Sequence, residues 1–231
     1  MNKPRPLLTP TITRFEMIFG LIYLPIHVFG LPLLLSALFP EMSVLNGNLI
    51  YMGISLGVVA IFYHKMLRRE FDTLYDHPFL CLGTLIKGYG LWFALSMVMV
   101  LIMSALGVGE DTPNDVAIDE LAQEAYGATM MMSVIIAPIL EETLFRGVLF
   151  QSLLKKGRVL AYVVNILVFG FIHVWQYAVA YQDASYLLFL FQYVPVSFAL
   201  VWVYDRSGSL WTAIFFHMSN NYLAMKLAEL L

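Results

Sequence analysis

The chain has 231 residues, of which 60% are hydrophobic, 15% aromatic and only 13% charged. A soluble domain carries about 25% charged residues, and a disordered chain combines low hydrophobicity with high net charge, so this composition excludes both classes. The formal charge of −3 gives no reason to expect a nucleic-acid partner, and the single cysteine, Cys81, excludes a disulfide framework. We therefore expect an integral, multi-pass membrane protein surrounded by a lipid bilayer.

Seven apolar segments without strand-like alternation predict an all-α polytopic membrane helix bundle. They run approximately over residues 15–39, 49–63, 84–106, 127–150, 159–180, 186–204 and 210–228. At roughly 20 residues per span, a chain of this length accommodates about six to eight transmembrane helices. Pro25 and Pro32 interrupt the first segment and predict a kink there.

The segment 66–83 is not expected to cross the membrane. Arg68 and Arg69 adjoin apolar side chains, as in a helix that lies in the membrane interface. An irregular cytoplasmic loop is the alternative.

The basic residues predict the orientation of the bundle. Eleven of the thirteen lie on alternate connections, on one side of the membrane: Lys3, Arg5, Arg14, Lys65, Arg68, Arg69, Lys87, Lys155, Lys156, Arg158 and Arg206. Since positive loops stay inside, the N-terminus and these connections are expected in the cytoplasm. The acidic connection 110–124 is expected outside, as a solvated loop rather than a cation site.

Three of the C-terminal spans carry ionisable or amide groups that are costly in a bilayer. They are Glu141, Glu142 and Arg146 in the fourth span, His173 in the fifth, and His217 and Asn221 in the seventh. At about 1.5 Å per residue, Glu142, His173 and His217 lie roughly 16–22 Å from the basic residue that marks the cytoplasmic end of their own span. A shared depth favours one common site. The alternative is a buried polar network that only locks the helices together.

The spacing within the fourth span predicts different roles for its two carboxylates. Glu142 and Arg146 are four residues apart with the acid first, which favours an ion pair. Glu141 lies about 140° around the helix from Arg146 and is freer to face a cavity. A carboxylate near two imidazoles and an amide can polarise water and stabilise an oxyanion. The remaining histidines show no such grouping and are expected to be structural or solvated: His27, His64 and His77.

These residues resemble the three motifs of the CPBP (Abi) intramembrane protease family. That family groups type II CAAX prenyl endopeptidases with bacteriocin-processing and bacteriocin-immunity proteins. The matching stretches are Glu141-Glu142-x-x-x-Arg146, Phe169-x-x-x-His173 and His217-x-x-x-Asn221. The likeness covers about residues 130–225. We therefore expect a catalytic helix core over 126–231, preceded by N-terminal transmembrane helices over 1–125.

The resemblance implies an intramembrane endopeptidase in which Glu141 and His173 activate water while His217 and Asn221 stabilise the oxyanion. Expected substrates are membrane-associated peptides or proteins, such as bacteriocin or pheromone precursors, in a bacterial plasma membrane. The family is often described as metalloproteases, and His173 and His217 could hold zinc. The metal-free mechanism is preferred, because a desolvated glutamate beside two histidines can itself act as the base.

Two other classes of function compete with this hypothesis. A non-proteolytic scaffold or regulator of the same fold would bind another membrane protein, such as a sensor kinase, or confer bacteriocin immunity. A transporter would also explain buried Glu and His side chains, but it would more often show inverted repeats, and the sequence shows none.

Overall fold

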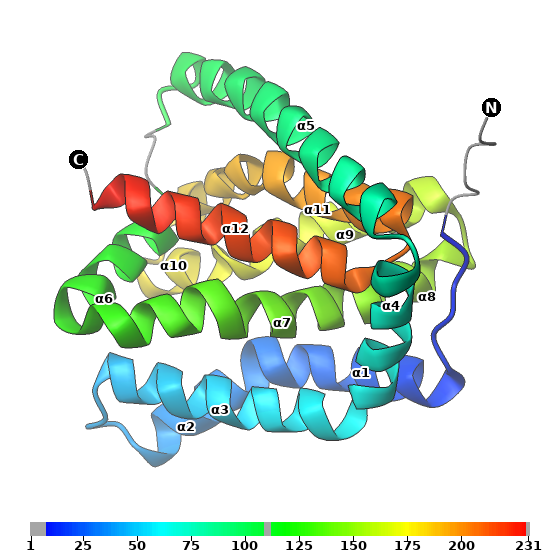
Figure 1. The fold of residues 1–231 in the computed structure, drawn as a ribbon. Helices are drawn as coiled ribbons and strands as arrows, with labels where there is room; N and C mark the ends of the chain where they lie inside the picture. Colours follow the sequence, from blue (N-terminus) through cyan, green and yellow to red (C-terminus); the bar gives the residue numbers. More distant parts are fainter. Residues whose placement is uncertain (1–7, 109–111, 230–231) are drawn as a thin grey trace.

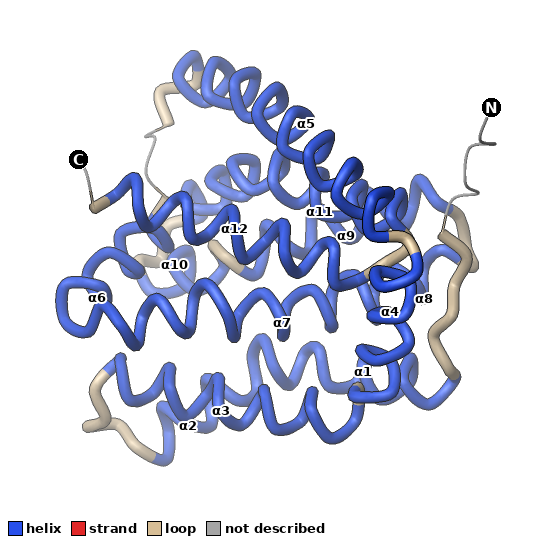
Figure 2. The backbone as a smooth tube through the Cα atoms, in the orientation of Figure 1, coloured by secondary structure: helices blue, strands red, loops and turns tan. Residues whose placement is uncertain are grey.

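The computed structural model describes residues 8–108 and 112–229, which are helical and contain no strand in these ranges. Five helical segments of the described chain are long and apolar enough to cross a membrane: Arg14–Leu38, Val44–Phe62, Pro78–Ala105, Pro113–Leu154 and Ala184–Ser207. A shorter apolar helix follows the fourth of these, at Arg158–Ile172. The predicted helical membrane bundle is confirmed, and each of the seven predicted segments coincides with a helical part of the chain (Figures 1 and 2).

The chain consists of α-helices joined by three π-helical segments and one 3₁₀ helix among the described residues. The α-helices are α1 (Arg14–Pro25), α2 (Leu31–Leu38), α3 (Val44–Phe62), α4 (His64–Asp76), α5 (Pro78–Ala105), α6 (Pro113–Met130), α7 (Ala137–Glu141), α8 (Gln151–Leu154), α9 (Arg158–Ile172), α10 (Trp175–Ala180), α11 (Val194–Ser207) and α12 (Leu210–Ala228). The π-helical turns are η1 (Ile26–Gly30), η2 (Met131–Ile136) and η3 (Glu142–Phe150), and η4 (Ala184–Tyr193) is a 3₁₀ helix.

The first span begins at a capping box and changes course where its prolines predict. The side chain of Thr13 accepts a hydrogen bond from the Glu16 backbone N–H, and the Glu16 carboxylate accepts one from the Thr13 N–H. The kink takes the form of the π-helical turn η1, which joins α1 to α2 between Pro25 and Pro32. Proline removes a backbone donor from the helix, so the local register widens there.

The structure decides between the helix and the loop left open for residues 66–83, and it corrects the loop predicted at 110–124. Residues 66–83 form most of α4 and the first turns of α5, so the alternative of an irregular loop is wrong. The predicted external loop 110–124 is also wrong from Pro113 onward, where α6 begins. A capping box between Thr112 and Asp115, with proline at the first helical position, starts this helix. Glu110 and Asp111 lie outside the described residues.

The connections that carry the basic residues meet at one end of the bundle. The Leu8 N–H donates to the Asp205 carbonyl, and the Arg158 guanidinium contacts both the Asp205 carboxylate and the Leu8 carbonyl. The Ser209 hydroxyl donates to the Glu70 carbonyl at 2.9 Å. Figure 1 shows α4 and α8 at this end, and α6 with the last turn of α12 at the opposite end. The two ends therefore differ in charge, as the positive-inside pattern requires.

The second half of the chain holds α9 against η4 by a close backbone approach. A Cβ added at Gly170 would lie 2.9 Å from the Leu190 carbonyl oxygen, so no larger residue fits without movement. This approach places the end of α9, which carries His173, beside the end of η4, which carries Tyr193.

The charge difference between the two ends predicts the orientation in the membrane. In a Cys81→Ser background, Glu120→Cys on α6 should react with a membrane-impermeant thiol reagent in intact cells. Lys156→Cys, at the basic end, should react only after permeabilisation. Both positions are exposed, so accessibility within the fold does not bias the comparison. The reverse labelling pattern would overturn the assigned orientation.

Candidate active site

Three helices bring the predicted site residues together. Glu141 ends α7, His173 caps the C-terminus of α9, and His217 lies in α12. The Glu141 Oε2 atom lies 3.9 Å from His173 Nε2 and 4.0 Å from His217 Nε2. One carboxylate oxygen therefore faces both imidazoles, as the shared depth in the sequence predicts.

The neighbouring carboxylate, Glu142, is engaged in a fully buried ion pair. Arg146 Nη1 donates to Glu142 Oε1 at 3.0 Å, and neither side chain is exposed at all. Arg146 Nη2 also donates to the Ser197 hydroxyl at 3.1 Å, and its guanidinium carbon lies 4.3 Å from the centre of the Phe169 ring. An unpaired charge is costly in this setting. The negative charge of Glu142 balances the positive charge of Arg146, so the ion pair fixes the position of Glu142.

The hydrogen-bond partners of the two imidazoles fix which ring nitrogen carries the proton. His173 Nδ1 lies 2.7 Å from the Phe169 carbonyl oxygen, and His217 Nδ1 lies 2.9 Å from Glu142 Oε1. Both partners accept, so both Nδ1 atoms must donate. In the neutral form of each ring, Nε2 then presents a lone pair toward Glu141.

Glu141 differs from Glu142 in both exposure and bonding. Its side chain is 18% exposed and lines a cavity. Its Oε2 atom is buried, with no hydrogen-bond partner among the described residues. The Oε2 atom of Glu142 also has no partner among the described residues, but Glu142 is not exposed and does not line the cavity. Glu141 is therefore the carboxylate of the pair that a molecule in the cavity can reach.

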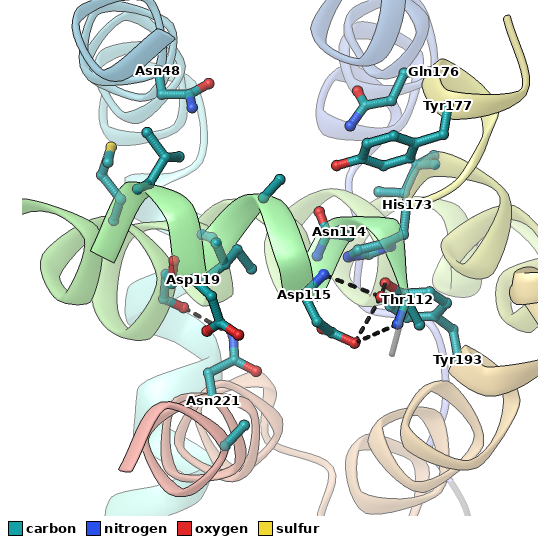
Figure 3. A pocket seen from close by; sticks show the side chains of 18 of the residues that line it. Asn48, Thr112, Asn114, Asp115, Asp119, His173, Gln176, Tyr177, Tyr193 and Asn221 are labelled. Carbon is teal, nitrogen blue, oxygen red and sulfur yellow. Dashed lines mark hydrogen bonds between the residues drawn. The ribbon is translucent and has the colours of Figure 1, made fainter. Parts of the chain in front are cut away.

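The cavity has a volume of about 1260 Å³ and extends from the site toward the acidic end of the bundle. At one side it is lined by Glu141, His173 and His217, and at the other by the exposed acids of α6: Asp115, Asp119, Glu120 and Glu124. Figure 3 shows His173 beside Tyr177 and Tyr193, and Asp115 and Asp119 projecting from α6. A peptide segment has room in this volume.

Asn221 enters the same cavity from α12. One of its amide N–H groups donates to the Ser133 carbonyl on η2 at 2.9 Å. Figure 3 shows its side chain close to Asp119. The Asn221 side chain thus lies in the cavity wall between η2 and α6.

Aromatic side chains fix the ring of His173 in this position. Its ring stacks on the ring of Tyr193, with centroids 4.5 Å apart. The centroid of the Phe169 ring, the first residue of the same F-x-x-x-H motif, lies 4.7 Å from that of His173. The Tyr193 hydroxyl is bonded in turn to the Thr112 hydroxyl at 2.9 Å. The sequence prediction missed Tyr193 and Thr112, because no spacing rule links α9 to residues in η4 and at the start of α6.

His27 is buried and hydrogen-bonded, which agrees with a structural role, but it also lies beside the cavity. His27 is 5% exposed, contacts Tyr51 and Ser55 through its two ring nitrogens, and lines the cavity with Glu141. The other two histidines, His64 and His77, are exposed as expected.

The predicted zinc ligands can be tested against this geometry. Ligands of tetrahedral zinc bound at about 2.0–2.1 Å lie roughly 3.4 Å apart. Within the described ranges, no group of three His, Cys, Asp or Glu side chains lies close enough to hold a metal ion. The donors are chemically suitable, but their positions do not fit a bound metal, and the metal-free mechanism stays a prediction.

Comparisons with known proteins agree with the motifs. Residues 124–223 match the family described as type II CAAX prenyl endopeptidase Rce1-like. A Bacillus subtilis (strain 168) protein named "Putative membrane peptidase YdiL" is 30% identical over 116 residues. That alignment covers 50% of this chain and 43% of the relative, so the chain matches less than half of the relative's length. No solved structure matches the chain significantly.

The metal question has a direct measurement. We expect the purified protein to hold far less than one zinc per chain, because its donors are too far apart. We also expect a chelator to leave its melting temperature unchanged. Stoichiometric zinc that disappears in His173→Ala would contradict this expectation, and the exposed His77→Ala serves as the matched control.

Proposed function

Since residues 124–223 match the family described as type II CAAX prenyl endopeptidase Rce1-like, we propose that this protein is an intramembrane endopeptidase. It hydrolyses a peptide bond of a membrane-associated peptide or protein by water that Glu141 activates. The observation that carries this proposal is the contrast between the two carboxylates. Glu142 is fully buried and its Oε1 atom bonds both Arg146 and His217, whereas Glu141 lines the cavity with its Oε2 atom facing His173 and His217.

Glu141 and His173 supply the acceptors that hold the water. A water between Glu141 Oε2 and His173 Nε2, which are 3.9 Å apart, can donate one hydrogen bond to each. As its oxygen bonds to the carbonyl carbon of the substrate, the water gives a proton to Glu141. The tetrahedral intermediate then collapses, the C–N bond breaks, and the proton passes from Glu141 to the departing amine. The water thus supplies the hydroxyl group of the new carboxylic acid and the proton of the new amine, so no other proton donor is needed.

His217 and Asn221 lie where the oxyanion forms. The Asn221 amide carries two N–H groups, one of which donates to the Ser133 carbonyl. His217 donates from Nε2 only when both ring nitrogens are protonated, because Nδ1 already faces the Glu142 Oε1 acceptor. Donors aimed at the developing charge lower the barrier most in a site that excludes bulk water.

The position of the cavity favours entry of the substrate from the acidic end. The basic connections close the opposite end through Glu70, Arg158 and Asp205. The exposed carboxylates of α6 rim the entrance. If the basic end is cytoplasmic, as the positive-inside rule predicts, substrates enter from the outer half of the membrane. Secreted peptide precursors, such as bacteriocins or pheromones, satisfy this requirement.

The proposal predicts peptides whose processing depends on Glu141. In cells that produce Glu141→Gln, a set of membrane peptides should accumulate uncut, whereas wild-type cells cut them. Loss of the base should lower turnover by about 10²–10⁴-fold, and the isosteric substitution should leave the amount of folded protein nearly unchanged. Mass spectrometry of peptides and new N-termini in membranes from the two strains measures this.

Glu41→Gln is the matched control, because Glu41 is an exposed loop residue that does not line the cavity. Its peptide profile should equal that of the wild type. If Glu141→Gln also gives the wild-type profile while a binding partner still copurifies, the protein is a scaffold or regulator rather than a protease.

A further inference from the structure

A second polar group lies in the cavity wall and comes from the N-terminal half of the chain. The Tyr51 hydroxyl lies 2.9 Å from His27 Nε2, and the Ser55 hydroxyl lies 3.0 Å from His27 Nδ1. Ser55 is fully buried and His27 is 5% exposed, whereas Tyr51 is half-buried. Tyr51 and His27 line the same cavity as Glu141. None of these three residues falls in the stretch that matches the family.

The local backbone explains how the group reaches the cavity. His27 lies in the π-helical turn η1, which turns its side chain toward α3 at the kink after Pro25. The helix α3 packs against η2 and α7, and Tyr51 of α3 lines the same cavity as Glu141, the last residue of α7. Figure 3 shows Asn48, three residues before Tyr51 and on the same face of α3, projecting into the cavity. Single π-helical turns occur often at functional sites.

The three side chains form a hydrogen-bonded relay in which the protons can be donated in either of two directions. In one direction Ser55 donates to His27 Nδ1 and His27 Nε2 donates to the Tyr51 oxygen, which frees the Tyr51 O–H to donate into the cavity. In the other direction Tyr51 donates to His27 and can only accept. A substrate oxygen accepts hydrogen bonds, so its binding selects the first direction.

The site described above has more acceptors than donors. Glu141 is a carboxylate, and the neutral His173 ring presents a lone pair from Nε2, while His217 donates from Nε2 only in its doubly protonated form. Asn221 is the other donor, and one of its N–H groups is already bonded to the Ser133 carbonyl. An oxyanion in a site of this kind is stabilised by preorganised donors, and losing one of them commonly costs about 10²–10³ in kcat.

We propose that Tyr51 is a further catalytic residue, whose hydroxyl donates a hydrogen bond to the carbonyl oxygen of the scissile bond as it becomes an oxyanion, and that His27 is the positioning residue that orients it. This inference rests on the proposed protease function. The relay therefore couples the N-terminal half of the bundle to the chemistry of the C-terminal core.

A role in helix packing alone predicts a different pattern from a catalytic role. Tyr63 provides the comparison, because its hydroxyl also bridges the first span and α3, donating to the Glu16 carbonyl at 3.2 Å. Tyr63 is fully buried and does not line the cavity. Loss of either hydroxyl removes one hydrogen bond between the same two spans, but only that of Tyr51 faces the substrate.

The test uses purified full-length protein in lipid nanodiscs. The probe is a synthetic copy of the membrane peptide that accumulates most in Glu141→Gln cells. Tyr51→Phe should lower kcat by about 10²-fold with little change in KM, whereas Tyr63→Phe should keep the wild-type kcat. For the positioning role, His27→Phe should lower kcat similarly. His27→Gln, whose amide N–H can replace the donor at Nε2, should recover most of the loss.

The outcomes separate this inference from the proposed function. If wild type cuts the peptide and Tyr51→Phe retains the wild-type kcat, the inference is wrong while the protease function stands. Equal losses in Tyr51→Phe and Tyr63→Phe, tracking melting temperature, would assign Tyr51 to packing and also overturn it. If no peptide depends on Glu141, the proposed function fails and the inference fails with it.

Discussion

The buried ion pair between Arg146 and Glu142 is the constraint on which the rest of the site depends. A guanidinium without any solvent exposure must be compensated, and removing one partner of such a pair commonly costs about 3–5 kcal/mol. Glu142 meets this requirement and, through the same oxygen, accepts from His217 Nδ1. The ring of His217 is thereby fixed with its other nitrogen toward Glu141. Two adjacent carboxylates thus take different roles because only one lies in reach of the arginine.

The sequence contains this division in its spacing, which explains why the central site was predictable. A separation of four residues places Glu142 beside Arg146, and the preceding residue is turned away from it. Polar groups are costly in a bilayer, and this cost identified His173, His217 and Asn221 as candidate site residues on the other spans. Helix rise then placed His173 and His217 at the depth of the glutamates. Each step uses local geometry along a single helix.

Residues that join the site through tertiary packing were not predictable in this way. Tyr193 and Thr112 reach His173 because α9, η4 and the start of α6 meet, which no pattern within one segment encodes. His27 lies beside the cavity with partners Tyr51 and Ser55 on a different span, so this position could not be predicted from its own segment. The start of α6 was missed for another reason. The acidic residues of the stretch 110–124 indicated a solvated loop. Thr112, Pro113 and Asp115 nevertheless form a recognisable signal for the start of a helix.

The central claim is that Arg146 selects Glu142 as its partner and leaves Glu141 free, and two double-mutant cycles test it most directly. Unfolding free energies are measured in detergent for Arg146→Met, Glu142→Gln and their combination, and again with Glu141→Gln in place of Glu142→Gln. The account predicts a coupling of about 1–3 kcal/mol between Arg146 and Glu142, and near additivity, within about 0.5 kcal/mol, between Arg146 and Glu141. A coupling with Glu141 as large as that with Glu142 would contradict the account.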